Sequence, residues 1–189
     1  MTKFDVYTKD TVQGDAAEML GSIKEAYGFV PNLYGILAES AAVLKAYMSL
    51  GKIFDESSFS ATERQVIILA VSRFNDCRYC MAAHSVVAGM QNVPDTAIEP
   101  VRNDQPIADD KLETLRLFAT AVTEKRGWVT ESDIRAFLAA GYTKAQILEV
   151  VLGVSFKTIS NYVNHIADTP LDDAFSPKAW KPVVERLAS

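Results

Sequence analysis

The feature that most constrains this chain is a recurrence of helix start signals ahead of apolar stretches with a helical period. Residues 60–63 (Ser-Ala-Thr-Glu) and 143–146 (Thr-Lys-Ala-Gln) both form capping boxes, the reciprocal side-chain-to-backbone bonds that open a helix. No segment alternates convincingly with the period of two that a strand requires. Further helices are expected to begin at Asp15, Ser40, Asp109 and Thr130. The sequence therefore predicts one all-α domain over residues 1–189.

The two capping boxes suggest an internal repeat. A shift of 81 positions superposes three pairs of residues: Thr62 on Thr143, Gln65 on Gln146, and His84 on His165. The identities are few, so a true repeat and a chance match both stay open. A true repeat gives two helical halves, a core in residues 60–90 and a second copy at about residues 141–170. Only the first copy then carries sulfur, because Cys77 and Cys80 meet Thr158 and Asn161 under the shift.

Cys77 and Cys80 are the only cysteines, and His84 follows four residues after the second. On a helix the three residues fall at i, i+3 and i+7, so they line one face. Two neighbouring thiols can cycle between dithiol and disulfide, and an adjacent imidazole can hold one sulfur as the reactive thiolate. A helix start favours Cys77 as the thiolate, whereas the position of His84 favours Cys80. The spacing indicates thiol redox chemistry without deciding which sulfur attacks.

Charge and hydropathy narrow the possible partners. The formal net charge is -5, and no basic stripe is present to bind a phosphate backbone, so no nucleic acid partner is expected. No apolar run is long enough to cross a bilayer, and the N-terminal residues do not resemble a signal peptide. We therefore expect a cytoplasmic protein with no membrane partner. In that reducing compartment a Cys-x-x-Cys pair is catalytic or metal-binding more often than structural.

Residues 60–90 resemble the core of the AhpD-like alkylhydroperoxidases, a family of the carboxymuconolactone decarboxylase superfamily of all-α proteins. The resemblance rests on Glu63-Arg64-Gln65 followed by Cys77-x-x-Cys80-x-x-x-His84. The segment 141–165 resembles the C-terminal half of uncharacterised peroxidase-related members. Together the similar regions extend from about Phe29 to Phe175.

The resemblance implies a thiol-dependent peroxidase. Cys80 would attack a hydroperoxide, Cys77 would then close a disulfide, and His84 would relay the proton. No bound cofactor is expected, because the chain has no glycine-rich nucleotide fingerprint. An external dithiol would return the electrons, and in well-studied members it is a lipoyl group on a partner protein. Family members also form trimers or hexamers, so we expect a homo-oligomer.

The chain departs from the family pattern at Gln65, where a glutamate of the proton relay is usual. An amide cannot accept a proton in this role. Glu63 is a possible relay group, but it lies about 200° around the helix from Gln65 and is expected to act as a cap. The sequence thus predicts weak hydroperoxide turnover, which a carboxylate at position 65 would raise.

Other functions fit parts of the same pattern. Cys77 and Cys80 can be buried structural thiols, or can join His84 and His165 as four tetrahedral metal ligands. A cofactor-free decarboxylase of the carboxymuconolactone type is a second enzyme class, although that chemistry does not need the thiol pair. A non-enzymatic thiol-sensing or zinc-binding interaction protein is a third class.

Overall fold

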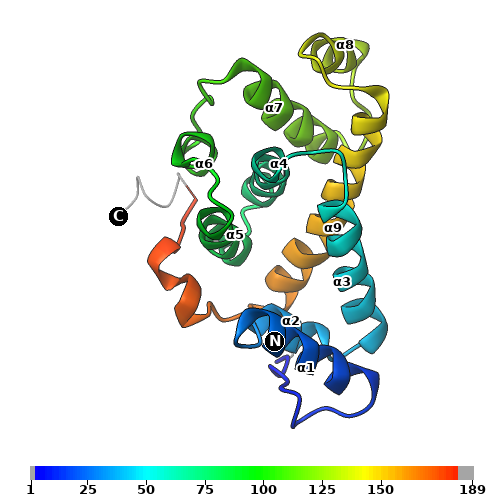
Figure 1. The fold of residues 1–189 in the computed structure, drawn as a ribbon, viewed down its shortest axis with the longest axis vertical. Coiled ribbons are helices and arrows are strands. Elements are labelled where there is room, and N and C mark those ends of the chain that lie inside the picture. The colour runs from blue at the N-terminus through cyan, green and yellow to red at the C-terminus, as the bar shows by residue number, and fades with distance from the viewer. Residues whose placement is uncertain (1–2, 183–189) are drawn as a thin grey trace.

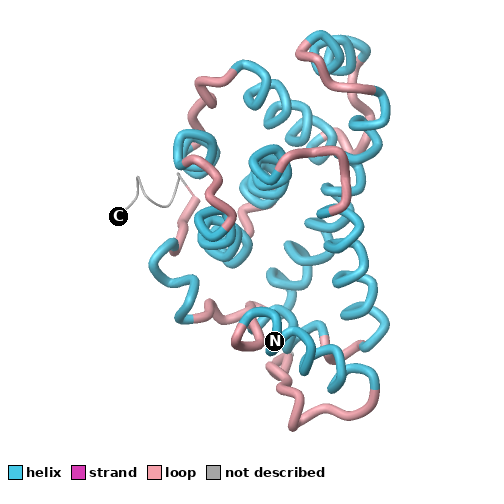
Figure 2. Tube along the Cα trace, in the orientation of Figure 1, coloured by secondary structure: helices cyan, strands magenta, loops and turns pink. Residues whose placement is uncertain are grey.

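The structure, a computed structural model, describes residues 3–182, and every regular element in that range is a helix (Figures 1 and 2). The elements are α1 (Asp15–Tyr27), α2 (Asn32–Leu37), α3 (Ala41–Asp55), α4 (Ala61–Phe74), α5 (Arg78–Met90), α6 (Asp95–Asn103), α7 (Asp110–Glu124), α8 (Glu131–Ala139), α9 (Lys144–Ala167) and the short 3₁₀ helix η1 (Asp173–Lys178). The predicted all-α class is confirmed. The ends of the predicted domain, residues 1–2 and 183–189, lie outside the described range.

Helix α4 forms the centre of the molecule. Its residues 66–71 are all buried, as expected for a helix that is apolar on every side. Helices α5, α6, α7 and α9 pack around it, and Figure 1 shows α4 enclosed by them. Because α4 begins at the predicted capping box of Ser60 and Glu63, the position of Gln65 in its second turn is set by a local signal.

Helix α9 approaches α3 and α4 closely at Gly153. A Cβ atom on this glycine would lie 2.9 Å from Ile67 and 2.9 Å from the ring of Phe54. The residues four, seven and eleven positions further along share this inward face, and Lys157, Ser160 and Asn164 are all buried. Gly153 therefore permits the close contact that brings the polar residues of α9 to the core.

The turn between α4 and α5 places both cysteines. Asn75 ends α4, and Asp76 has a left-handed backbone (φ 52°), which a short polar side chain tolerates. Cys77 then caps α5, and its sulfur accepts a hydrogen bond from the Cys80 amide at 3.4 Å. The N-cap of α5 is therefore Cys77 itself.

The other start signals are confirmed at Ser40, Asp109 and Thr130, whose side chains accept amide hydrogen bonds at the first turns of α3, α7 and α8. Helix α1 follows Gly14 and begins at Asp15. Helices α2 and α6 are not among the predicted helices, and each begins directly after a proline, Pro31 or Pro94. A proline also suits the first residues of a helix, since it lacks the amide that has no partner there.

The two halves of the predicted repeat differ in their secondary structure. The first half is the helix pair α4 and α5, whereas residues 144–167 form one continuous helix, α9. The residues matched by the 81-residue shift therefore do not form a second helical pair.

Within residues 3–182, no single helix is long and apolar enough to cross a membrane. The pair α8 and α9, bent by 112° at their junction, meets that test only when the two helices are taken together.

We predict that Gly153→Ala destabilises the fold by about 1–3 kcal/mol, because its methyl group would meet the fully buried side chains of Ile67 and Phe54, which must shift to admit it. Gly21→Ala in α1 is the matched control, since its Cβ meets nothing within 4 Å and alanine favours a helix. Urea unfolding of the variants measures both effects. Equal stability of the two variants would contradict the close packing of α9.

Candidate active site

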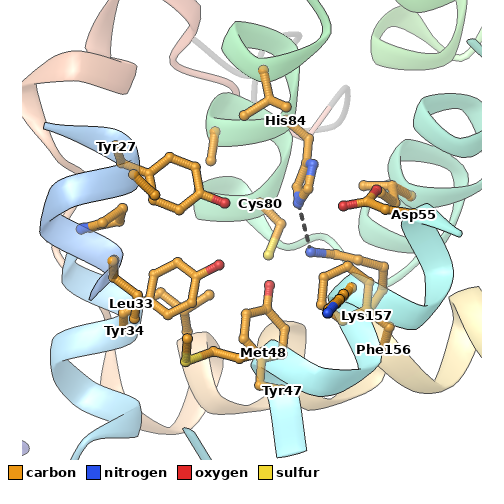
Figure 3. Close-up of a pocket in the computed structure, with 18 of the residues that line it drawn as sticks. Tyr27, Leu33, Tyr34, Tyr47, Met48, Asp55, Cys80, His84, Phe156 and Lys157 are labelled. Carbon is orange, nitrogen blue, oxygen red and sulfur yellow. Dashed lines mark hydrogen bonds between the residues drawn. The ribbon is translucent and has the colours of Figure 1, made fainter. Parts of the chain in front are cut away.

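A cavity of about 730 Å³ lies in front of Cys80. Its walls come from α1 and α2 on one side and from α3, α4, α5 and α9 around the rest (Figure 3). Aromatic rings dominate the labelled walls, and the hydroxyl groups of Tyr27, Tyr34 and Tyr47 point toward the Cys80 sulfur. The sulfur thus meets an apolar chamber with a few polar groups directed at one point, as is typical of small-molecule sites.

Cys80 is buried and surrounded by groups that favour its ionised form. Asn164 Nδ2 donates a hydrogen bond to its sulfur at 3.2 Å, and Ser160 Oγ lies 3.7 Å away. Burial alone would raise the pKa of this thiol. The hydrogen bond from Cys77 and the positive charge of Lys157 outweigh burial and lower the pKa of Cys80 to about 5. At neutral pH Cys80 is therefore a thiolate.

Cys77 lies close to Cys80 and has the opposite character. Its hydrogen bond to the Cys80 sulfur, its burial and the negative charge of that sulfur all raise the pKa of Cys77. Its sulfur also receives a hydrogen bond from Asn164 Nδ2 at 3.6 Å. The pair therefore consists of one thiolate and one thiol that donates to it.

His84 is held in one protonation state by its two partners. Gln65 donates its amide group to Gln91 Oε1 at 3.0 Å, which leaves Gln65 Oε1 to face His84 Nδ1 at 3.3 Å. Since a carbonyl oxygen only accepts, Nδ1 carries the proton. His84 Nε2 then accepts from Lys157 Nζ at 2.9 Å, the dashed line in Figure 3. Burial and the charge of Lys157 lower the pKa of His84, so the ring is neutral.

Lys157 is one of the site residues that the sequence analysis did not identify, together with Asn164 and the tyrosines of the cavity. Its side chain is fully buried, and its Nζ lies 4.9 Å from the ring centroid of Phe156 and 6.0 Å from that of Tyr47. Among the described residues no carboxylate forms an ion pair with it. The available signal was a single cation in an otherwise apolar and neutral helix face, a residue type that is seldom fully buried.

The predicted site residues divide into two groups. The structure brings Cys77, Cys80, His84 and Gln65 together. Glu63 is not among the residues that line the cavity, and its carboxylate accepts from the Ser60 amide at 2.9 Å in the capping box. Its other oxygen lies 3.6 Å from Lys111 Nζ.

Tyr79 anchors the turn that carries the two thiols. Its hydroxyl donates to Asp172 at 2.6 Å and accepts from the Leu33 amide at 3.3 Å. Asp172 in turn accepts from the Asn32 amide at 3.1 Å, at the start of α2. This network joins the cysteine turn to α2 and to the segment after α9, with the ring of Tyr79 packed edge-on against Phe175.

The four residues of the alternative metal site, Cys77, Cys80, His84 and His165, do not all line one cavity. His165 and Cys77 line a second cavity, whereas Cys80 and His84 line the first. Over the part of the chain that the structure describes, no group of three or more His, Cys, Asp or Glu residues is arranged to hold a metal ion.

Comparison with known proteins places the chain in context. Residues 41–109 match the carboxymuconolactone decarboxylase family. No curated protein matches the chain significantly. A solved structure described as an alkylhydroperoxidase AhpD core, an uncharacterised peroxidase-related protein from Ralstonia eutropha JMP134, has a TM-score of 0.81 and 21% identity over 92% of this chain and 93% of that one.

Two further solved proteins share the fold. An uncharacterised peroxidase-related protein from Silicibacter sp. TM1040 has a TM-score of 0.77 and 22% identity over 93% of this chain and 97% of that one. A cysteine-to-alanine variant of the debrominase Bmp8, in complex with 2,3,4-tribromopyrrole, has a TM-score of 0.71 and 16% identity over 85% of this chain and 87% of that one. The shared fold is AhpD-like and all-helical.

We predict that iodoacetamide labels Cys80 far ahead of Cys77 at neutral pH. Because the pKa of Cys80 is depressed to about 5, its thiolate is present above that pH and is lost as the pH falls through it. The labelling rate should therefore be level from about pH 6 upward and fall below about pH 5. Trypsin cleaves at Arg78, between the cysteines, so mass spectrometry assigns each label. A rate that rises only toward the ordinary thiol pKa would contradict the assignment.

Lys157→Met should raise the pKa of Cys80, because it removes the positive charge and keeps the length of the side chain. Labelling of Cys80 at about pH 6 should then slow by about tenfold or more. Lys52→Met is the control, since Lys52 lines the same cavity but is exposed. Thermal unfolding checks that the variant folds, because removing one partner of a buried charge pair is destabilising in general. An unchanged labelling rate would remove Lys157 from the site.

Proposed function

We propose that this AhpD-like member of the carboxymuconolactone decarboxylase superfamily is a thiol-dependent oxidoreductase that reduces organic hydroperoxides through Cys77 and Cys80. Membership rests on the family match and on the shared fold. One observation carries the proposal: a buried thiolate beside a protonated thiol, at the end of an aromatic cavity. A nucleophile and a resolving group are then present in one turn of chain.

The first step is the attack of the Cys80 thiolate on the terminal oxygen of the hydroperoxide. The O–O bond breaks, Cys80 becomes a sulfenic acid, and the remaining oxygen leaves as an alkoxide that needs a proton. Tyr34 and Tyr47 supply suitable donors, because burial raises the pKa of both phenols and keeps them protonated. Cys77 then attacks the sulfenic sulfur, water leaves, and the disulfide forms.

In this proposal the positive charge of Lys157 stabilises the Cys80 thiolate, and His84 acts by positioning Lys157. His84 accepts a hydrogen bond from Lys157 and directs the positive charge toward the sulfur. The resemblance implied a proton relay through His84, but a neutral ring between a lysine and an amide has no proton acceptor beyond it. We therefore assign His84 and Gln65 as positioning residues, and the tyrosines as the proton donors.

Other expectations accompany this function. The electrons come from an external dithiol, such as a lipoyl group on a partner protein, and no bound cofactor is involved. Assembly as a trimer or hexamer and a cytoplasmic location remain predictions. The aromatic lining of the cavity favours an apolar organic hydroperoxide over hydrogen peroxide.

A second candidate function is reductive dehalogenation of an aromatic compound. The debrominase Bmp8 shares the fold, and a chamber of aromatic rings in front of a thiolate suits a flat aromatic ligand. Two thiols and a carbon–bromine bond give a disulfide, a carbon–hydrogen bond and hydrogen bromide. The thiols thus supply two electrons, as they do in the reduction of a hydroperoxide. The decarboxylase alternative has no use for the thiol pair.

Steady-state assays with cumene hydroperoxide, dithiothreitol and the purified protein test the proposal. We expect Cys80→Ser to abolish turnover, and Cys77→Ser, treated with hydroperoxide in the absence of dithiothreitol, to consume about one equivalent and stop at the sulfenic acid. A brominated phenol assayed in parallel tests the second candidate through bromide release. Inertness of the wild type with both substrates, while the disulfide still forms in diamide, would leave a dithiol exchange protein or sensor.

Gln65→Glu should lower turnover rather than raise it. The new carboxylate would pair with the His84 and Lys157 group, draw positive charge away from Cys80, and raise the pKa of that thiol. This expectation is the opposite of the one drawn from the sequence alone. Glu63→Gln is the control, with unchanged kcat/KM, because Glu63 acts as a helix cap. Faster turnover of Gln65→Glu would restore the carboxylate relay that the family resemblance implies.

A further inference from the structure

The two sulfurs are reached from different sides of the molecule. Cys80 lines the first cavity, and Cys77 lines a second one of about 660 Å³. The turn that carries the cysteines separates the two, and Tyr79 is the one residue that lines both. The second cavity is bordered by α9 on one side and by the segment around Trp180 on the other.

The chemical character of the second cavity differs from that of the first. Beside the rings of Tyr79 and Trp180, a larger share of its lining residues is charged or polar: Asp76, Arg78, Asn164, His165, Asp168, Lys181. Asn164 is 6% exposed, and its Nδ2 donates to both sulfurs. Its Oδ1 is buried and has no hydrogen-bond partner in the described structure. A buried acceptor without a partner, in a residue that lines the cavity, suits a ligand that brings a hydrogen-bond donor.

The chemistry of disulfide exchange selects one of the two sulfurs. A thiolate that attacks a disulfide expels the other sulfur, and a thiol of lower pKa leaves faster. The pKa of Cys80 is depressed, and that of Cys77 is raised. Attack at Cys77 therefore releases the better leaving group. Cys77 is also the sulfur-bearing residue of the second cavity, so geometry and leaving-group chemistry agree.

We propose, on the basis of the function above, that the second cavity is the docking site of the dithiol reductant, which attacks Cys77 there. The donor thiolate forms a bond to the Cys77 sulfur, the Cys77–Cys80 bond breaks, and Cys80 leaves as the thiolate. The second thiol of the donor then attacks its own bound sulfur. That step closes the donor disulfide and releases Cys77, which takes the proton of the second thiol. Substrate and reductant thus use separate entrances.

Paired cavity-filling variants test the separate entrances. Ala179→Trp fills the second cavity, and Val87→Trp fills the first. Each protein is oxidised with diamide and its reduction by dithiothreitol is timed, so the result does not depend on hydroperoxide turnover. Ala179→Trp should slow reduction by about tenfold or more and spare oxidation by cumene hydroperoxide, and Val87→Trp should do the reverse. Reduction slowed only by Val87→Trp would overturn the proposal.

A trapping experiment on the unaltered protein gives an independent result. The oxidised protein is treated briefly with 2-mercaptoethanol, quenched with N-ethylmaleimide and cleaved by trypsin at Arg78. We expect mercaptoethanol on the peptide of residues 74–78, which contains Cys77, and maleimide on Cys80. The opposite distribution would place the attack at Cys80 and overturn the proposal.

The source of the dithiol is distinguished by comparing free dihydrolipoamide with a reduced lipoylated carrier domain. Faster reduction by the free compound identifies a small-molecule donor, and faster reduction by the carrier identifies a prosthetic arm. In either case the loss of rate in Ala179→Trp supports the second cavity as the docking site. Equal rates for Ala179→Trp and the wild type with both donors would contradict it.

Discussion

The site depends on the attraction between two buried charges, the ammonium group of Lys157 and the thiolate of Cys80. A charge removed from water is costly unless another charge or a set of hydrogen bonds compensates it. Lys157 is compensated by His84 Nε2 and by the ring of Phe156, and the thiolate by Asn164. Each ion makes the burial of the other tolerable. The rest of the architecture serves to bring α5 and α9 close enough for this pair to form.

The neutral amide at position 65 has a physical reason in this arrangement. With a carboxylate at position 65, the anion nearest to Lys157 and His84 would be that carboxylate rather than the Cys80 thiolate. Gln65 offers His84 an oxygen that accepts a hydrogen bond and adds no charge. Gln91 fixes the orientation of the Gln65 amide. The hydrogen bonds then run from Gln65 through His84 to Lys157, whose cation faces the cysteines. The absence of a carboxylate at position 65 therefore leaves Cys80 as the anion that the charge of Lys157 stabilises.

The sequence allowed prediction of those features that depend on local chemistry. Caps at Ser40, Ser60 and Thr143 are bonds within one turn of chain, and they were found where expected. The shared face of Cys80 and His84 follows from helical spacing. Lys157 and Asn164 lie about 80 residues away, and their approach depends on tertiary packing at Gly153. Of the cavity tyrosines, Tyr34 lies on the short helix α2, which the sequence did not predict, whereas Tyr27 and Tyr47 lie on the predicted helices α1 and α3 and reach the site through tertiary packing.

Helix α9 also has a consequence for how relatives of this protein should vary. Lys157 on α9 and Gln65 on α4 are joined through the imidazole of His84 on α5, so neither position is free to change alone. A lineage that acquires a carboxylate at position 65 gains an internal partner for the cation and no longer needs the sulfur as its counter-ion. We therefore expect the two positions to covary: lysine with an amide, and an uncharged residue with a glutamate. The pair would then divide this fold into two electrostatic designs that share one Cys-x-x-Cys motif.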